Sequence, residues 1–387
     1  MLSFGLLPKV AGRLSHPPPD LHIPPRLIPL CRPCCFLHFA CTLPRTSRNI
    51  FRVNYLLFLV TMDFTFGGKY KLEEEIAMGG CGTVFQGVHT VAGKEVAIKL
   101  EPAIARSSPL KQESKIYKTL MGGPGVPWLM WSGKQGDYNV MVVDLLGPSL
   151  EDLFRMCNRY FSLKTVLLLA DQLISRIEYI HSRDLVHRDI KPANFVMGTG
   201  KNVDFVNIID FGLAKKFRDP RTGLHIPYKQ DDHHGVGTCL FAAINTHLGI
   251  DCSRRDDLES LAYMLIYFMR GSLPWRRLKG KDTASTWDLI KDKKLECEQL
   301  LTVGLPPEFE VFYTYVRGLE FGDLPDYEGL RQLFKGLAER EGIEYDNIYD
   351  WTVPSNDGTP TRERKRQRFC SACAKAGKHG HGRAVSS

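Results

Sequence analysis

The chain has 387 residues, of which 43% are hydrophobic and 24% charged, a composition that is ordinary for a soluble folded protein and excludes a mainly disordered chain. Its formal net charge of +8 is uneven, because residues 1–61 carry about +6 and residues 362–387 about +7, which leaves about −5 for the central part. The 11 cysteines lack the spacing of a disulfide framework, so we expect free thiols in a reducing compartment.

Residues 1–61 do not resemble part of a folded domain. Prolines at 17–19 interrupt regular structure, the cysteines at 31–35 lack a second cluster that would complete a zinc site, and the apolar run 55–60 is too short to cross a bilayer. A mitochondrial presequence is an alternative, because the segment is basic and almost free of acidic residues. We favour a disordered or non-native extension, with the native product beginning at Met62, where the composition changes.

Residues 70–143 alternate short apolar runs with turn signals, which predicts strands and one helix around residues 109–121. Two early strands flank a glycine-rich stretch that keeps Gly79 and Gly82, although Ala77 stands where G-x-G-x-x-G has its first glycine. Glycine lets a backbone approach a phosphate group closely, because no Cβ intervenes. The stretch therefore predicts a loop that covers phosphates.

A lysine ends the next predicted strand, since the apolar run 96–98 leads directly to Lys99. Glu113 follows fourteen residues later inside a helix-compatible run and is the best candidate for a carboxylate partner of Lys99. Residues 149–182 then carry two stretches with the apolar periodicity of helices. Residues 254–350 are also expected to be mostly helical.

Residues 187–194 read H-R-D-x-K-x-x-N, and D-F-G follows at Asp210, which are the catalytic loop and the metal loop of a protein kinase. In this pattern Asp189 accepts the proton of the substrate hydroxyl, and Lys191 neutralises the phosphoryl group in transfer. Asn194 and Asp210 hold two magnesium ions over the triphosphate. A lysine two residues after the aspartate is typical of serine/threonine kinases.

Residues 352–387 form a basic tail of low apolar content, which we expect to be disordered. Its charged run 362–368 is a candidate nuclear import signal or a contact for an acidic partner, and a solvated charge run is the plainer alternative. Cys370 and Cys373, with two histidines nearby, would allow a zinc site, but the short glycine-rich spacing argues against it.

Several motifs together resemble the casein kinase 1 family. They are Leu145–Leu153, Phe161–Val166, Ile177–Ser182, His225–Tyr228, Ala243–Ile250, Ser253–Ser260, Gly271–Trp275 and Pro325–Tyr327. Most protein kinases carry A-P-E near the end of the activation segment, whereas this family carries S-I-N, and the matching residues here are 243–245. The similarity runs from about Tyr70 to Trp351, roughly three quarters of the chain.

The resemblance implies an α+β, bilobal protein-kinase fold, with a small, mostly β N-lobe at residues 70–143 and a larger, mostly α C-lobe at residues 147–351. It implies a serine/threonine kinase that uses ATP and Mg²⁺ and transfers the γ-phosphoryl group to protein hydroxyls. Val143 would be the gatekeeper, and residues 144–146 the hinge whose backbone binds adenine. The residues expected to surround ATP are Ile76, Gly79, Gly82, Val84, Ala97, Lys99, Glu113, Val143, Asp144 and Leu146.

The departures from this family concern substrate choice. Its members typically prefer sites primed by an upstream phosphate or acidic residues, which basic residues in the activation segment and after L-P-W recognise. Here Leu240 takes the place of an arginine, and Thr283 and Thr286 take usual lysine positions, while Arg276 and Arg277 are candidates to compensate in part. Because leucine cannot make the charge-assisted contact of arginine with phosphate, we predict an altered anion site at Leu240, Arg277 and Thr286.

A rival interpretation from another class is a weakly active pseudokinase that acts as an interaction module. Only the altered glycine-rich loop and the altered anion site support it, because every residue that the chemistry needs is present. Nucleic-acid binding by the basic tail would be an addition to either function. We expect protein substrates with serine or threonine, an acidic partner or import receptor for the tail, no membrane association, a monomer, and a cytoplasmic or nuclear location.

A chain that begins at Met62 should unfold at the same temperature and turn over as fast as the full chain, because the change in composition at that residue indicates that residues 1–61 do not pack on the domain. Thermal unfolding and a peptide-phosphorylation assay of both chains test this. A large loss of melting temperature on deletion would contradict it, and N-terminal sequencing of the native product would show where that product starts.

Overall fold

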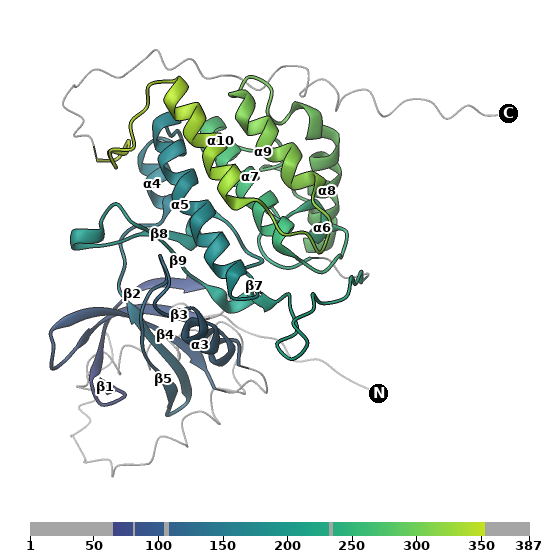
Figure 1. The fold of residues 1–387 in the computed structure, drawn as a ribbon. Coiled ribbons are helices and arrows are strands. Elements are labelled where there is room, and N and C mark those ends of the chain that lie inside the picture. Colours follow the sequence, from purple (N-terminus) through teal and green to yellow (C-terminus); the bar gives the residue numbers. More distant parts are fainter. Residues whose placement is uncertain (1–64, 80–81, 104–107, 232–234, 353–387) are drawn as a thin grey trace, which may run out of the picture. The chain divides into compact units, whose positions relative to one another are not determined.

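The computed structural model describes residues 65–79, 82–103, 108–231 and 235–352 (Figure 1). An antiparallel β-sheet with one helix forms the N-lobe, and the C-lobe is mostly helical. The predicted α+β, two-lobed architecture is therefore confirmed. The predictions made for residues 1–61, for the basic tail and for the two cysteine motifs lie outside the described residues.

The N-lobe sheet has the strand order β1-β2-β3-β4-β6-β5, with each neighbouring pair antiparallel. The strands are β1 (Thr65–Phe66), β2 (Tyr70–Gly79), β3 (Gly82–His89), β4 (Lys94–Pro102), β5 (Leu129–Gln135) and β6 (Tyr138–Asp144). Along β3, buried and partly exposed side chains alternate, because successive residues of a strand point to opposite faces. The apolar run that leads to Lys99 is buried in the middle of this sheet.

Helix α3 (Pro109–Leu120) belongs to the N-lobe and begins at a clear cap. The Ser108 hydroxyl accepts the backbone N–H of Lys111 at 3.2 Å, and proline occupies the first helical position, where its missing N–H costs nothing. One face of α3 is buried, and this face includes Glu113. The burial of an amphipathic helix therefore brings a carboxylate into the interior.

The C-lobe helices surround two that are buried along most of their length. The helices are α4 (Leu150–Met156), α5 (Leu163–Ser182), α6 (Ile244–His247), α7 (Arg254–Arg270), α8 (Thr283–Cys297), α9 (Pro307–Gly318) and α10 (Tyr327–Arg340). Helices α5 and α7 are the buried pair, and α5 lies along α10 in Figure 1. Because the first turns of α7 bury acidic residues as well, those carboxylates need partners inside the protein.

Short paired strands bring two loops together between the lobes. Strand β7 (Leu185–Val186) pairs with β10 (Lys215–Lys216), and β8 (Phe195–Met197) pairs with β9 (Val206–Ile208). Single turns of 3-10 helix are η1 (Pro192–Asn194), η2 (Gly200–Asn202), η3 (Phe211–Leu213) and η4 (Glu298–Leu300). As a result, the loop 187–194 lies beside the loop 209–214, and the Ile209 N–H donates to the Asn194 carbonyl at 2.9 Å.

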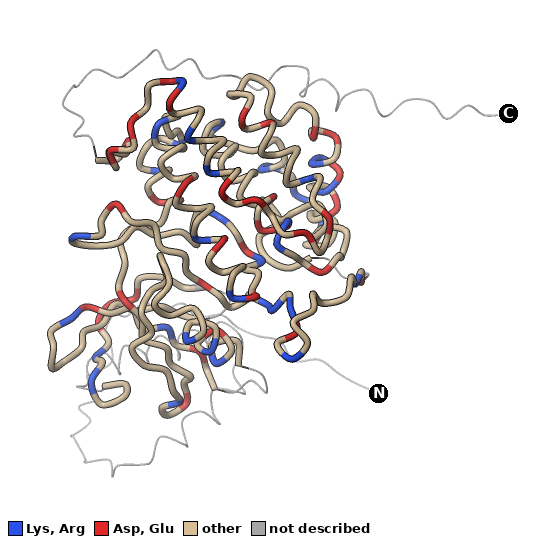
Figure 2. Tube along the Cα trace, viewed as in Figure 1, with Lys and Arg blue, Asp and Glu red and all other residues tan. Residues whose placement is uncertain are grey.

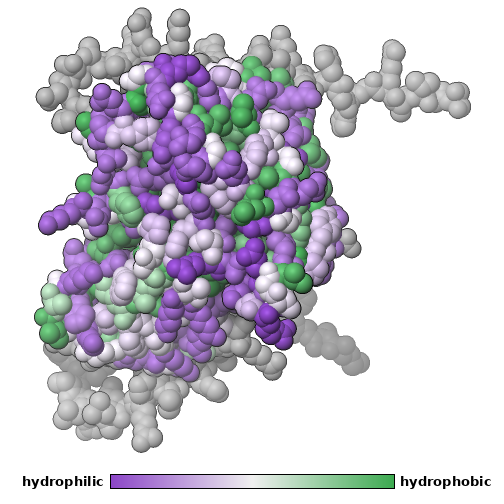
Figure 3. All heavy atoms as spheres, viewed as in Figure 1, coloured by the Kyte–Doolittle hydropathy of each residue, from purple (hydrophilic) through white to green (hydrophobic). Residues whose placement is uncertain are grey.

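The surface of the described residues is mixed in character. Acidic and basic residues are interspersed along the chain (Figure 2), and the face drawn in Figure 3 is mainly hydrophilic with small groups of hydrophobic residues. No helix among the described residues is both long enough and apolar enough to span a bilayer. Cys239 and Cys252 carry free thiols, as predicted.

Candidate active site

A buried group of three charges joins the sheet to the loop that begins at Asp210. On β4, Lys99 Nζ lies 2.8 Å from Glu113 Oε2 of α3 and 3.2 Å from Asp210 Oδ1. The side chains of Lys99 and Glu113 are 13% and 1% exposed, whereas that of Asp210 is 37% exposed and remains open to a ligand. The expected pairing of Lys99 with Glu113 is therefore present.

The three charges shift one another's pKa values. Burial by itself lowers the pKa of Lys99, but the charges of Glu113 and Asp210 outweigh it and raise the pKa. Burial raises the pKa of Glu113, and Lys99 offsets this only in part. Burial also acts to raise the pKa of Asp210, but there the charge of Lys99 dominates and lowers it. Lys99 is thus held as an ammonium and Asp210 as a carboxylate, which are the charge states that bind a polyanion and a cation.

Asp189 lies at the centre of a hydrogen-bonded group. Its Oδ2 accepts from Lys191 Nζ at 2.5 Å, its Oδ1 accepts from the Thr238 hydroxyl at 2.7 Å, and its carbonyl accepts from Asn194 Nδ2 at 2.8 Å. Gly237 has a φ of +91°, and a Cβ there would lie 3.3 Å from Asp189 Oδ1 and closer still to the backbone. Glycine at 237 therefore lets Thr238 reach the aspartate.

The carboxylate of Asp257, near the start of α7, anchors this loop. It accepts the backbone N–H of His187 at 2.7 Å and that of Arg188 at 2.9 Å, and His181 Nε2 lies 2.9 Å from it. Burial would raise the pKa of Asp257, but the hydrogen bond and charge of His181 outweigh burial and lower it. Arg188 has a φ of +68°, a conformation that costs a non-glycine residue roughly 1–3 kcal/mol, and the bonds to Asp257 offset that strain.

Aromatic rings connect α3 to both loops. The buried ring of Phe211 lies edge-on to Tyr117 of α3, with 4.9 Å between ring centroids, and 5.4 Å from the ring of His187. His187 Nε2 also lies 3.1 Å from the carbonyl oxygen of Ile209. His187 therefore supports the loops through hydrogen bonds.

Asn194 and Asp210 suit a divalent cation. Asn194 Nδ2 donates into its own loop, so its Oδ1 is the atom available to a metal. The carboxylate of Asp210 is partly exposed and charged. Magnesium prefers oxygen ligands and commonly takes only one or two carboxylates from the protein, with phosphates completing its shell. The residues present therefore fit the ions that the sequence implies.

Residues expected around ATP line the neighbouring strands. Ala97 of β4 pairs with Val143 of β6, and both are buried, while Val84 of β3 is partly exposed and pairs with Lys99. Gly79 and Gly82 face each other at the ends of β2 and β3. Gly82 has a φ of +134°, and a Cβ there would come 2.4 Å from the backbone of β4, so the glycine-rich loop ends in a conformation that glycine alone adopts easily.

At the predicted hinge, the side chain of Asp144 is engaged within the fold. Its carboxylate accepts Lys94 Nζ at 2.8 Å and the Trp128 N–H at 2.7 Å, and its own N–H donates to the Trp128 carbonyl at 3.2 Å. The side chain and the N–H of Asp144 are therefore already bonded within the fold. The side chain of Ile76, on β2, is 46% exposed.

The residues of the predicted anion site do not come together as a basic cluster. Leu240 lines a pocket beside the catalytic loop, and Arg276 lines it too, whereas Arg277 is exposed. The Thr286 hydroxyl accepts an N–H at 2.9 Å and donates to a carbonyl at 2.8 Å, both from the loop that precedes α8. Thr286 is thus committed to its own loop, and the two cations that line the pocket with Leu240 are Lys191 and Arg276.

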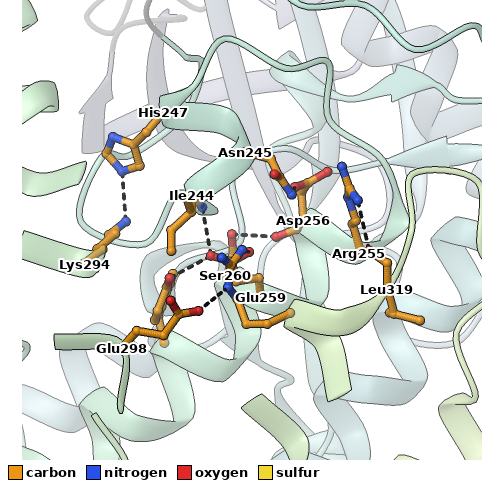
Figure 4. A network of polar contacts seen from close by, with 12 residues as sticks. Ile244, Asn245, His247, Arg255, Asp256, Glu259, Ser260, Lys294, Glu298 and Leu319 are labelled. Atoms are coloured by element: carbon orange, nitrogen blue, oxygen red, sulfur yellow. Dashed lines mark hydrogen bonds and ion pairs between the residues drawn. The ribbon is translucent and has the colours of Figure 1, made fainter. Parts of the chain in front are cut away.

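The segment after Leu240 is held by a carboxylate from the C-lobe (Figure 4). Glu259 Oε1, on α7, accepts the Ile244 N–H at 2.8 Å and the Tyr263 hydroxyl at 2.7 Å. Its Oε2 lies 3.1 Å from Arg317 Nη1 of α9. The matching segment of most kinases carries its own glutamate, whereas here the carboxylate comes from α7.

A buried lysine completes this support. Lys294 of α8 is 1% exposed, and its Nζ donates to the carbonyls of Cys239 and Ala242 and lies 3.0 Å from His247 Nε2 (Figure 4). Burial lowers the pKa of Lys294 to about 7, and burial together with the charge of Lys294 lowers that of His247 to about 3. The imidazole therefore stays neutral at physiological pH and accepts a hydrogen bond from the ammonium.

Four contributors to the site were missing from the residues that the sequence predicted, namely Thr238, Asp257, Glu259 and Lys294. Asp257 and Glu259 lie within a motif of the resemblance, but no spacing rule links them to backbone groups that lie 70 and 15 residues away. Lys294 lies in a helix rich in charged residues, so its sequence context indicates an exposed side chain.

The family model described as Protein kinase domain matches residues 70–308, which is more than half of the chain. The matched range contains the three-charge group, the catalytic loop and the segment held by Glu259 and Lys294. A β-sheet N-lobe and a helical C-lobe are the architecture of this domain.

Acid should destabilise the protein through His247. The imidazole has a pKa of about 6.5 when unfolded and about 3 when folded, so between these values only the unfolded chain takes up the proton. Its contribution to stability is present above pH 6.5 and is lost as the pH falls. On going from pH 7.5 to pH 5 we expect a loss of about 2 kcal/mol in the free energy of unfolding from this group.

Urea unfolding of the unmodified chain and of His247→Gln at both pH values tests this. Glutamine keeps an oxygen acceptor for Lys294 but does not titrate, and the titration of Lys294 near pH 7 is expected in both chains and cancels in the comparison. The variant should therefore lose about 2 kcal/mol less on acidification. An equal pH dependence of the two chains would contradict the prediction.

Proposed function

The chain belongs to the protein kinase family, and we propose that within this family it is a casein kinase 1-like serine/threonine kinase that transfers the γ-phosphoryl group of ATP to hydroxyls of proteins. The observation that carries the proposal is the group around Asp189, in which the carboxylate, Lys191 and Thr238 are all within hydrogen-bond distance of one another. This arrangement provides a proton acceptor and a cation at one point.

Each residue of the site has a definite task in this proposal. Asp189 accepts the proton of the incoming hydroxyl, and the bonds to its two oxygens fix the direction of the carboxylate. Lys191 shifts from the aspartate toward the phosphoryl oxygens as negative charge develops there. Lys99, oriented by Glu113, holds the α- and β-phosphates.

Asn194 and Asp210 would hold the magnesium ions through their side-chain oxygens. Bound magnesium supplies charge neutralisation of the phosphates during transfer. The protein's own contribution is to keep these oxygens in place, through the Asn194 bond to Asp189 and the Asp210 bond to Lys99. Preference for serine and threonine is supported by Lys191, whose position two residues after Asp189 is typical of that class.

The pseudokinase remains the second candidate, and Ala77 in the glycine-rich loop is the observation that favours it. The paired Lys99 and Glu113, and the shared bonds of Asp189, favour a working enzyme instead. We propose in addition that the enzyme acts as a monomer in the cytoplasm or the nucleus, and that the basic tail contacts an acidic partner or an import receptor.

Asp189→Asn should lower turnover by about 100- to 10,000-fold while leaving ATP affinity largely intact, because it removes the proton acceptor and not a phosphate ligand.

Asp210→Ala should weaken both turnover and magnesium-dependent ATP binding. Single-turnover phosphorylation and calorimetric ATP titration measure the two effects. Asp288→Asn, at an exposed position on α8, is the matched control, and wild-type turnover by Asp189→Asn would refute the assignment.

The altered anion site predicts weak discrimination in favour of primed substrates. A lost charge-assisted contact of about 1.5–3 kcal/mol corresponds to roughly a ten- to hundred-fold loss of preference for a phosphorylated upstream residue. Leu240→Arg should restore part of that preference with little change on unprimed peptides. Leu289→Arg adds the same charge at an exposed position on α8 and should restore none.

The kcat/KM ratio for primed and unprimed forms of one peptide measures this preference. A strong preference for the primed form in the unmodified enzyme would show that Arg276 or Arg277 reads the anion, and our interpretation of Leu240 would then fail.

A further inference from the structure

A pocket of about 180 Å³ opens directly beside the catalytic loop. One of its walls is formed by Lys191, Pro192 and Ala193, the residues that follow Asp189 by two to four positions. Lys191 Nζ is 2.5 Å from Asp189 Oδ2, so a residue of the pocket wall directly contacts the proposed proton acceptor. A peptide whose hydroxyl lies at Asp189 must therefore place a flanking residue at or near this opening, because an extended chain advances only about 3.3–3.6 Å per residue.

The lining of the pocket is mainly apolar. Opposite the loop lie Leu240, the buried ring of Phe241 and the buried ring of Tyr267, while Pro192 and Ala193 complete the apolar surface. An arginine at position 240, the usual residue in the family that the sequence resembles, would bring a positive charge to the lining of the pocket. Leu240 and Ala193 give the pocket a hydrophobic lining instead.

The acidic group at the pocket is already neutralised. Glu151 of α4 is 15% exposed, and its Oε1 lies 3.1 Å from Arg155 Nε and 3.5 Å from Arg159 Nη1. The Tyr267 hydroxyl donates to the same carboxylate at 3.2 Å. A substrate arginine would have to compete with two arginines and a hydroxyl that already contact this carboxylate.

The basic group at the pocket is also engaged. The guanidinium carbon of Arg276 lies 5.8 Å from the centroid of the Tyr267 ring, within the range of a cation–π contact. The other cation of the lining, Lys191, is paired with Asp189 at 2.5 Å, and position 240 carries leucine in place of the arginine of the related kinases. A single arginine held over a ring is a weaker receptor for phosphate than a cluster of two or three basic side chains.

From this lining, we propose that the pocket binds an apolar side chain of the protein substrate, such as leucine, methionine or phenylalanine, that flanks the phosphorylated serine or threonine. The size agrees, because a cavity of about 150 Å³ lined by apolar side chains accommodates benzene. The inference rests on the proposed kinase function and adds the class of residue that the substrate presents. Where relatives recognise an anion, this enzyme recognises a hydrophobic residue.

The test uses the full chain and a set of peptides with one serine. Each of the three positions on either side of the serine is occupied in turn by leucine, phenylalanine, alanine, aspartate, phosphoserine or arginine. We expect kcat/KM to rise by about ten-fold or more over alanine for leucine and phenylalanine at one position, since apolar pockets discriminate by roughly 10- to 200-fold. Equal rates for leucine and alanine at every position, or a preference for arginine, aspartate or phosphoserine, would overturn the proposal.

Two variants locate the effect in the pocket. Ala193→Phe fills it and Leu240→Ala removes part of its wall, so each should reduce the leucine-to-alanine ratio toward one. Because the ratio is measured within one enzyme, a general loss of activity does not affect it. Ala92→Phe, at an exposed turn between β3 and β4, makes the same change elsewhere and should leave both the ratio and the rate unchanged. A ratio that survives both pocket variants would overturn the proposal.

Failure of the kinase function itself has a different signature. If the unmodified chain phosphorylates no peptide, the proposed function fails, and the pocket is then tested by fluorescence anisotropy of the same labelled peptides. Leucine-dependent binding that is lost in Ala193→Phe supports an apolar subsite without catalysis. Equal binding of the leucine and alanine peptides overturns it.

Discussion

The buried carboxylate of Asp257 is the constraint on which the candidate site depends. A charge inside a helical lobe is expensive unless every oxygen has donors, and here the donors come from the backbone of His187 and Arg188 and from the side chain of His181. Satisfying the carboxylate therefore fixes the first residues of the catalytic loop against α7. The strained backbone of Arg188 is stable only because this anchor holds it, and Asp189 follows in the next position.

The same principle connects the two lobes. Lys99 belongs to the sheet, Glu113 to the one helix of the N-lobe and Asp210 to a loop of the C-lobe, so a single ammonium balances carboxylates from three separate elements. The ring of Phe211, next to Asp210 in the chain, packs against Tyr117 and His187 and so joins α3 to the catalytic loop as well. Ion pairs and ring packing between side chains thus position the residues that are proposed to hold phosphate and metal.

In the segment that contains Leu240, buried charged side chains of the C-lobe bond the backbone groups that a strand or a long helix would otherwise satisfy. The segment from Cys239 to His247 contains only one short helix, and its carbonyl and N–H groups are bound by Lys294 and Glu259 instead of by a strand or a long helix. Leu240 is therefore presented by a rigid backbone, although its own side chain makes no polar contact. A change of side chain at this position can alter what the enzyme recognises without disturbing the support beneath it.

The sequence alone was enough to predict the two-lobed α+β fold, because several motifs along the chain resemble one family. It was also enough to identify the reactive residues, because their spacing within one loop is a local property. Asp189, Lys191 and Asn194 lie within six residues, and the family motif already places them on one loop. Pairing of Lys99 with Glu113 could also be expected, since a strand and the next helix are neighbours along the chain. Only the tertiary structure could show that Asp257, Glu259 and Lys294 hold these loops, because the contacts join residues 15 to 70 positions apart and a charged side chain in a sequence usually indicates solvent. It also decided that Arg276, and not Arg277, shares the pocket with Leu240, because the direction of each side chain after Trp275 depends on how that turn packs against the C-lobe.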